Sequence, residues 1–127
     1  MPDAFPLRVL IVDNHPDFWQ AARWALEQDA RFEFVAEVTN AAEALRLAAQ
    51  ESIDLVLLGL RLPDLNGFET ARRLRAQKRE LTIVLVASDL QEEHRRQARR
   101  ADIRACLVKD EFNASLLAEV LALPDAE

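Results

Sequence analysis

Five short apolar segments recur along the chain, and stretches with helical spacing separate them. They fall at residues 8–12, 32–37, 54–58, 82–86 and 105–108. The first, third and fourth are almost continuously apolar, which is typical of strands covered on both faces of a parallel sheet. The second segment mixes apolar and charged residues, so we expect it nearer the edge of that sheet.

The stretches between these segments each place apolar residues on one helical face. The faces are Phe18, Ala22, Ala25 and Leu26; Ala41, Ala44, Leu45 and Ala48; Phe68, Ala71 and Leu74; and Leu116, Leu117, Val120 and Leu121. Pro16 suits a first helical turn, Asn40 and Asp89 are predicted N-caps, and the last helix stops before Pro124. Strand and helix alternate five times. This predicts a (βα)5 α/β fold of the flavodoxin-like kind, a doubly wound parallel sheet with strand order 2-1-3-4-5.

The fourth helical stretch, residues 90–102, differs from the others because it offers only Leu90, Ala98 and Ala101 for burial. We expect it to pack weakly, with an i,i+4 pair between Glu92 and Arg96 giving some local support. It also carries a basic cluster, formed by Arg95, Arg96, Arg99 and Arg100. We interpret this cluster mainly as a solvated face, the alternative being a patch for nucleic acid or an acidic partner.

Composition narrows the class of protein further. A length of 127 residues suits one domain, spanning 1–127 with its β/α core at about 7–123. The net charge of −6 makes nucleic acid an unlikely partner for this domain. Cys106 is the only cysteine, and neither a signal-like segment nor a membrane-spanning apolar run occurs, so we predict a cytoplasmic protein. Two glycines, Gly59 and Gly67, are too few for a phosphate-cradling loop.

Ligands of such a sheet gather beyond the carboxyl ends of its strands. The motifs found there are Val-Asp-Asn-His-Pro at 12–16, Leu-Gly-Leu-Arg-Leu-Pro-Asp-Leu-Asn-Gly at 58–67 and Val-Lys-Asp at 108–110. Together they resemble the receiver domain of bacterial response regulators in two-component signalling, over nearly the whole chain. The pattern is most similar to receivers of regulators with a helix-turn-helix output.

The resemblance implies a site in which an acidic pair and a third aspartate bind magnesium, and the third aspartate accepts a phosphoryl group from a histidine kinase. This chain departs from that pattern at the acceptor position, which is Gly59, and at the second member of the pair, which is Asn14. A glycine has no nucleophile, and an amide is a weaker ligand for a hard cation. Asp13 is the only residual metal-ligand candidate, and we expect no metal site and no cofactor.

Two switch positions of the family also differ. The family spacing places Ala87 where a hydroxyl is usual, with Ser88 one residue beyond, and Cys106 where an aromatic residue is usual. Asp13 and Lys109 remain, and we expect them to form an ion pair at the pocket mouth, with a structural or a binding role. His15 and His94 are expected at the surface, and Asp64 is expected to point away from the pocket.

The sequence therefore predicts an atypical, non-enzymatic receiver-like domain that has lost phosphoryl acceptance and acts through protein-protein interaction. Its expected partner is a histidine kinase, a phosphotransfer or regulatory protein, or a second copy, with Trp19 and Trp24 on the first helix as the predicted contact surface. Two alternatives stay open: the receiver half of a DNA-binding transcriptional regulator, and a receiver phosphorylated at a non-standard acceptor.

Overall fold

The computed structural model describes residues 6–125, in which five parallel strands form one sheet. The strands are β1 (Leu7–Val12), β2 (Phe32–Val38), β3 (Leu55–Gly59), β4 (Thr82–Ala87) and β5 (Ala105–Val108). Their order is β2-β1-β3-β4-β5, so the predicted order is confirmed and the mixed segment β2 is indeed an edge strand. Every residue of the central strand β3 is buried, as its apolar sequence predicts.

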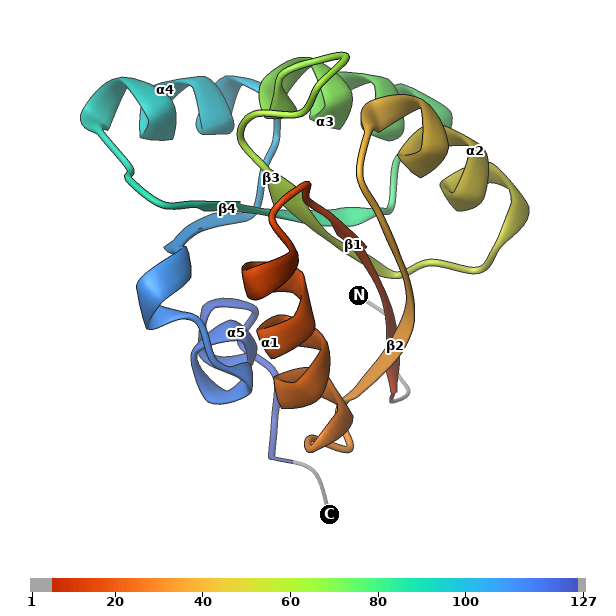
Figure 1. Ribbon diagram of the computed structural model, residues 1–127, viewed down its shortest axis with the longest axis vertical. Helices are drawn as coiled ribbons and strands as arrows, with labels where there is room; N and C mark the ends of the chain where they lie inside the picture. The colour runs from red at the N-terminus through yellow and green to blue at the C-terminus, as the bar shows by residue number, and fades with distance from the viewer. Residues whose placement is uncertain (1–5, 126–127) are drawn as a thin grey trace.

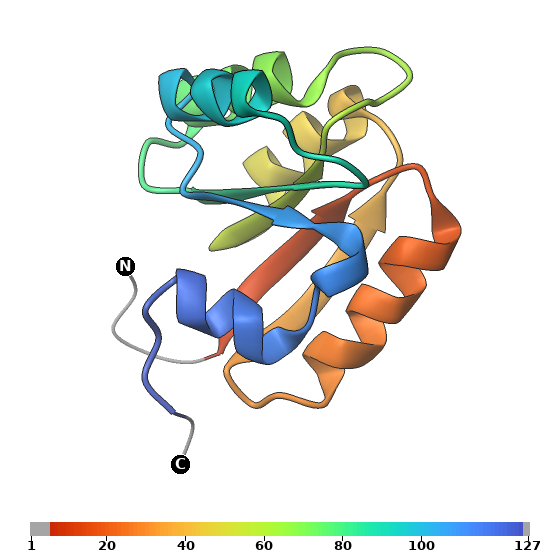
Figure 2. The ribbon, with the colours of Figure 1, turned by 90° about the vertical axis from the view of Figure 1, so that its left-hand side faces the viewer.

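The helices cover both faces of this sheet (Figures 1 and 2). They are α1 (Pro16–Glu27), α2 (Ala41–Gln50), α3 (Gly67–Gln77), α4 (Glu92–Arg100) and α5 (Ala114–Val120), and a 3₁₀ turn, η1 (Lys109–Glu111), follows β5. The α1 and α5 helices lie on one face, and α2, α3 and α4 lie on the other. The alternation of side chains along the strands therefore builds two apolar cores, one under each helix layer.

The starts of α1 and α2 are fixed by residues that were identified from the sequence. Pro16 occupies the first turn of α1, and the Asn40 side chain accepts a hydrogen bond from the Glu43 amide at the start of α2. The prediction of Asp89 as an N-cap is wrong, because α4 begins later. Gln91 is its N-cap residue, and the Gln91 amide donates to Nδ1 of His94.

The α4 helix is weakly packed, as predicted, since Ala98 is its only buried residue. The expected pair between Glu92 and Arg96 does not form. Arg96 pairs instead with Glu93, and Glu92 lies 3.6 Å from Arg99. Charges spaced at three, four and seven residues compete on one face of this helix, and the sequence alone does not decide which pairs form.

Within residues 6–125, none of the helices is long and apolar enough to cross a membrane.

Candidate functional site

The residues that follow the strands meet at one edge of the sheet, as the parallel topology requires. Asp13 follows β1, Gly59 ends β3, Ala87 ends β4, and Lys109 begins η1 after β5. Beside them lies a cavity of about 420 Å³, whose walls come from these strand ends, the segment after β3 and the start of α4. A cavity of this volume is large enough for a small molecule or a side chain of a partner.

Asp13 and Lys109 form a buried ion pair in this cavity. The ammonium Nζ of Lys109 lies 2.9 Å from Oδ1 of Asp13 and 3.0 Å from Oδ2. The Asp13 side chain is only 1% exposed and that of Lys109 is 12% exposed. The predicted pair is therefore confirmed, but it lies inside the protein rather than at the pocket mouth.

Aromatic residues of the α1 layer hold the lysine in place. Nζ of Lys109 lies 5.1 Å from the centre of the Phe18 ring, and that ring packs edge-on against Phe112 at 5.5 Å. An ammonium group over an aromatic face is attracted by the ring quadrupole. Lys109 is thus fixed by a carboxylate and by an aromatic ring, which leaves it little freedom to turn toward another anion.

Gly59 borders the ion pair directly. A Cβ atom at this position would lie 2.6 Å from Oδ1 of Asp13 and 3.3 Å from the carbonyl oxygen of Val12. The first distance is too short for a non-bonded contact, so a side chain at position 59 would require the Asp13 carboxylate to move. The Asp13 carboxylate can therefore hold its present position because residue 59 has no side chain.

Gly67 is required for a different reason. A Cβ atom there would lie 2.5 Å from the carbonyl oxygen of Gly59 and 3.2 Å from Cα of Leu60, which are both backbone atoms. Its amide donates a hydrogen bond to the carbonyl oxygen of Leu60 at 2.7 Å. Gly67 lets the start of α3 pack directly over the end of β3, and so it fixes the backbone next to the site.

The two histidines are closer to the site than the sequence predicts. His15 is exposed, as expected, but its Nδ1 lies 3.2 Å from Nζ of Lys109. His94 is half-buried and lines the cavity from α4, so its assignment as a plain surface residue needs correction. No spacing rule identifies these residues, because His15 precedes α1 and His94 lies in α4, and only the folded sheet brings both to the same cavity.

The remaining predicted positions also line the cavity or flank it. Ala87 is buried at the end of β4, whereas Ser88 is exposed on the rim, and both contribute to the cavity wall. Asn14 is exposed beside the buried Asp13. Cys106 is half-buried in β5, where burial raises the pKa of its thiol, and the nearby Arg95 and Arg99 lower that pKa by a smaller amount.

Asp64 does lie away from the cavity, and it has a structural role that the sequence did not indicate. Its carboxylate accepts hydrogen bonds from the amides of Ala41 at 2.9 Å and Ala42 at 3.0 Å, at the start of α2. These bonds lower the pKa of Asp64, the bond from Ala41 contributing most. Because Asp64 lies 23 residues after Ala41, its capping of α2 leaves no local pattern in the sequence.

The residues at this site do not fit a magnesium ion. Both carboxylate oxygens of Asp13 face Lys109, the neighbouring Asn14 is neutral, and Gly59 offers no side-chain oxygen. Across residues 6–125 there is no group of three or more His, Cys, Asp or Glu side chains arranged to hold a metal. A hard divalent cation prefers several oxygen ligands, and a single carboxylate shared with an ammonium group is a poor substitute.

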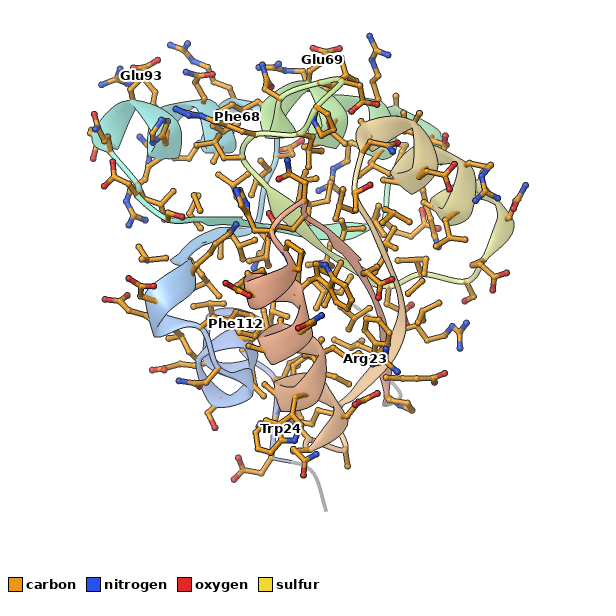
Figure 3. All side chains as sticks on the ribbon, viewed as in Figure 1. Arg23, Trp24, Phe68, Glu69, Glu93 and Phe112 are labelled. Carbon is orange, nitrogen blue, oxygen red and sulfur yellow. The ribbon has the colours of Figure 1, made fainter. Side chains whose placement is uncertain are left out.

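The two tryptophans of α1 differ in environment. Trp24 is 65% exposed, and Figure 3 shows it near the end of α1 that lies away from the cavity. Trp19 is partly buried against the core formed by α1, α5 and the sheet. The helical spacing predicts this contrast, since both residues cannot lie on the buried face.

The fold and the strand-end site define the class of protein. Residues 9–121 match the family model of the response regulator receiver domain, and the chain belongs to that family. It is 39% identical over 95 residues to the nitrate/nitrite response regulator protein NarP of Escherichia coli, a match that covers 71% of this chain and 44% of NarP.

Two further similarities agree with this assignment. A putative transcriptional regulator of Pseudomonas aeruginosa is 38% identical over 79 residues, which cover 62% of this chain and 38% of that protein. The signal receiver domain of the putative response regulator NarL from Mycobacterium tuberculosis superposes with a TM-score of 0.84 at 25% identity, over 94% of this chain and 96% of that one. The chain thus spans less than half the length of the curated relatives that it matches here.

Proposed function

We propose that this chain is an atypical receiver-like domain that signals through protein-protein interaction and does not accept a phosphoryl group at the usual strand-three position. The proposal rests on Gly59, which has no side chain at the end of β3, where the family carries its acceptor, and which lies beside the Asp13–Lys109 pair. A side chain at position 59 would have to displace the Asp13 carboxylate from the position in which it pairs with Lys109. Gly59 itself offers no atom that can attack phosphorus.

The electrostatics of the site support the same proposal. Phosphoryl transfer to a carboxylate needs a cation to neutralise charge on the phosphoryl oxygens. The lysine that would share this work is already bound to both oxygens of Asp13, and the residues for a metal ion are missing. Ala87 has no hydroxyl and Cys106 has no aromatic ring. The two side chains that respond to phosphorylation in the family are therefore missing.

The partner surface that we propose lies on α1. Trp24 is the large apolar side chain that the described part of the chain leaves most exposed, and exposed aromatic residues are enriched at interface hot spots. The partner is a signalling protein, such as a kinase or a phosphotransfer protein, or a second copy of the chain. We place the domain in the cytoplasm and treat residues 7–123 as one receiver-like unit with no enzymatic activity of its own.

A second candidate function is the receiver half of a DNA-binding transcriptional regulator. It is favoured by the P. aeruginosa relative, which is described as a putative transcriptional regulator, and by the share of that protein, 38%, that the match covers. In that case the receiver would act on an attached output domain. The same altered site would still make that action independent of phosphate.

A receiver that uses another acceptor is a weaker candidate. Asp64 is the first carboxylate after the usual position in sequence, but it caps α2 through the amides of Ala41 and Ala42 and does not line the cavity. An acceptor must reach the lysine that stabilises the phosphoryl group, and Asp64 is committed elsewhere.

The test is a two-dimensional amide spectrum of the uniformly ¹⁵N-labelled chain, recorded before and after addition of acetyl phosphate with magnesium. We expect the resonances of the cavity residues to stay in place. A new set of shifts at Ala87, Ser88 and Lys109 after addition of both reagents would contradict the proposal.

A further inference from the structure

A second hollow lies at the opposite end of the sheet from the ion pair. It has a volume of about 620 Å³ and lies between the end of α3, the start of β4 and the turn from α4 to β5. Four arginines line it, together with two acidic residues: Arg75, Arg79, Arg99, Arg104, Glu80 and Asp102. We call it the arginine hollow.

Arg75 builds the hollow rather than offering charge to a ligand. Its guanidinium group donates hydrogen bonds to the carbonyl oxygens of Arg79 at 2.9 Å, of Asp102 at 2.7 Å, and of Leu81. These three carbonyls belong to the loop after α3 and to the turn before β5. One side chain therefore ties together the segments that carry the other arginines, and the walls are fixed before any ligand arrives.

The other arginines are less committed. Across residues 6–125, Arg79 and Arg104 have no carboxylate oxygen within 4.0 Å, and the Arg104 guanidinium donates only to the carbonyl oxygen of Leu121 at 3.3 Å. Arg99 lies 3.6 Å from Glu92, but both side chains are strongly exposed, and such a pair contributes little. All three arginines are exposed to solvent.

Some neighbouring arginines on α3 and α4 lie within 4.0 Å of a carboxylate. Arg72 and Arg73 each pair with Glu69, and Arg96 pairs with Glu93. Figure 3 shows Glu69 and Glu93 on the outward sides of α3 and α4, which lie side by side in both ribbon views. Within residues 6–125, Arg95 and Arg100 on α4 have no carboxylate oxygen within 4.0 Å either, so unpaired positive charge lies both in the hollow and along α4.

Positive charge is also concentrated in one stretch of the sequence, which includes the arginines of the hollow. Residues 72–104 contain ten Lys or Arg and five Asp or Glu, a net of +5, in a chain of net charge −6, so the remainder carries −11. A long polyanion such as a nucleic acid would extend beyond the hollow onto negatively charged surface. A short acidic segment of a protein would meet the positive field alone.

We infer that the arginine hollow binds an acidic segment of a partner protein, through carboxylates that pair with Arg79 and Arg104. Arginine suits this role because its planar guanidinium group binds a carboxylate through two parallel hydrogen bonds. The hollow lies at the far end of the sheet from Gly59. Binding at the arginine hollow is therefore independent of whether the domain accepts phosphate. Different experiments test the hollow and the loss of phosphoryl acceptance.

The experiment uses a fluorescein-labelled peptide of ten glutamates and measures its anisotropy as the intact chain is added at low ionic strength. The test variant is Arg79→Ala with Arg104→Ala. The matched control is Arg72→Ala with Arg73→Ala, which removes the same charge from arginines that already have a carboxylate partner. Thermal melts of both double variants show that they are folded, and Arg79→Ala alone serves if the loss of Arg104 prevents folding.

The inference predicts saturable binding that weakens as salt is added, at least tenfold weaker binding by the test variant, and less than a twofold change in the control. Equal weakening in both double variants would show non-specific attraction and overturn the inference, as would a lack of binding by the wild-type chain. A ten-nucleotide thymidine strand is the competing probe. If it binds more tightly than the glutamate peptide, with the same dependence on Arg79 and Arg104, the partner is a nucleic acid and the inference is wrong.

Discussion

Lys109 binds both carboxylate oxygens of Asp13 at 2.9 and 3.0 Å, and this pair lies in the space beside Gly59 where an acceptor side chain would stand. The relationship joins three strand ends, because Asp13 follows β1, Gly59 ends β3 and Lys109 follows β5. Removing one partner of a buried ion pair typically costs about 3–5 kcal/mol, since the other charge is then left buried and unpaired. Loss of either partner should therefore destabilise this end of the sheet, whether or not the pair has a role in phosphate chemistry.

The arrangement predicts that an aspartate at position 59 has opposite effects in two backgrounds. In the wild type, Gly59→Asp places a second carboxylate against Asp13 and should lower the free energy of unfolding by about 1–3 kcal/mol. In the Asp13→Asn variant, the same substitution supplies a new partner to Lys109 and should raise stability. Urea denaturation of the four proteins gives both values and their coupling.

Gly59→Asn is the matched control for this cycle, because it has nearly the same size as the aspartate and no charge. It should destabilise both backgrounds. If Gly59→Asp lowered stability equally with and without Asp13→Asn, the ion pair would not be what excludes a side chain from this position.

Magnesium should leave the melting temperature nearly unchanged at millimolar concentration. A ligand present at 100 times its dissociation constant stabilises a folded protein by about 2.7 kcal/mol, which amounts to several degrees for a domain of this size. Of the two aspartates that line the cavity, Asp13 already has Lys109 as its partner, and Asp89 accepts a hydrogen bond from Gln91. Differential scanning fluorimetry with magnesium chloride, against sodium chloride of equal ionic strength, measures the effect, and a rise of several degrees would reveal a metal site.

The cap that Asp64 provides to α2 should make stability depend on pH. Its pKa lies below the ordinary value of 3.8 because the amides of Ala41 and Ala42 donate to the charged form. Its contribution is therefore complete above pH 3.8 and is lost as the pH falls through the lowered pKa. Asp64→Ala should cost about 1 kcal/mol at pH 7, the usual value for a lost helix cap, and progressively less in acid.

The control for this prediction is Asp110→Ala, which removes an exposed carboxylate for which no hydrogen bond is found in the described part of the chain. Urea melts should separate the two variants more at pH 7 than near pH 3. A constant difference at both values would mean that Asp64 acts through packing rather than charge.

Substitution of the two tryptophans should have different effects, one on stability and the other on association. Trp19→Ala should lower the free energy of unfolding by about 1–3 kcal/mol, because its ring packs partly into the core. Trp24→Ala should leave stability within about 0.5 kcal/mol, since its ring is mostly in water, and should weaken association with a partner or a second copy. Denaturant melts and light scattering measure the two quantities. If Trp24→Ala lost stability like Trp19→Ala and left association unchanged, Trp24 would be a packing residue.

The fold could be predicted largely because its signals are local. Continuous apolar runs mark β1, β3 and β4, and the spacing of Ala41, Ala44 and Ala48 marks the buried face of α2. The pairing of Asp13 with Lys109 was also predictable, since both follow strands that end at the same edge. The sequence could not show how deeply that pair is buried, nor that it fills the space beside Gly59, because both depend on packing between distant segments.

The features that the sequence missed involve contacts across the chain or competition between near neighbours. The cap that Asp64 provides to α2 and the hydrogen bond from Arg75 to the carbonyl oxygen of Asp102 each join segments more than 20 residues apart. Neither contact leaves a periodic pattern in the sequence. The start of α4 was misplaced because Asp89 and Gln91 both offer side-chain acceptors before the helix. His94 decides the outcome, since its ring accepts a hydrogen bond from the Gln91 amide.

The most direct test of the loss of phosphoryl acceptance is the intact mass of the chain after incubation with acetyl phosphate and magnesium. The account predicts an unchanged mass for the wild type, because Gly59 has no nucleophile and Asp13 is buried against Lys109. A gain of about 80 Da, the mass of one phosphoryl group in place of a proton, that disappears on treatment with hydroxylamine would identify an acyl phosphate and contradict the account.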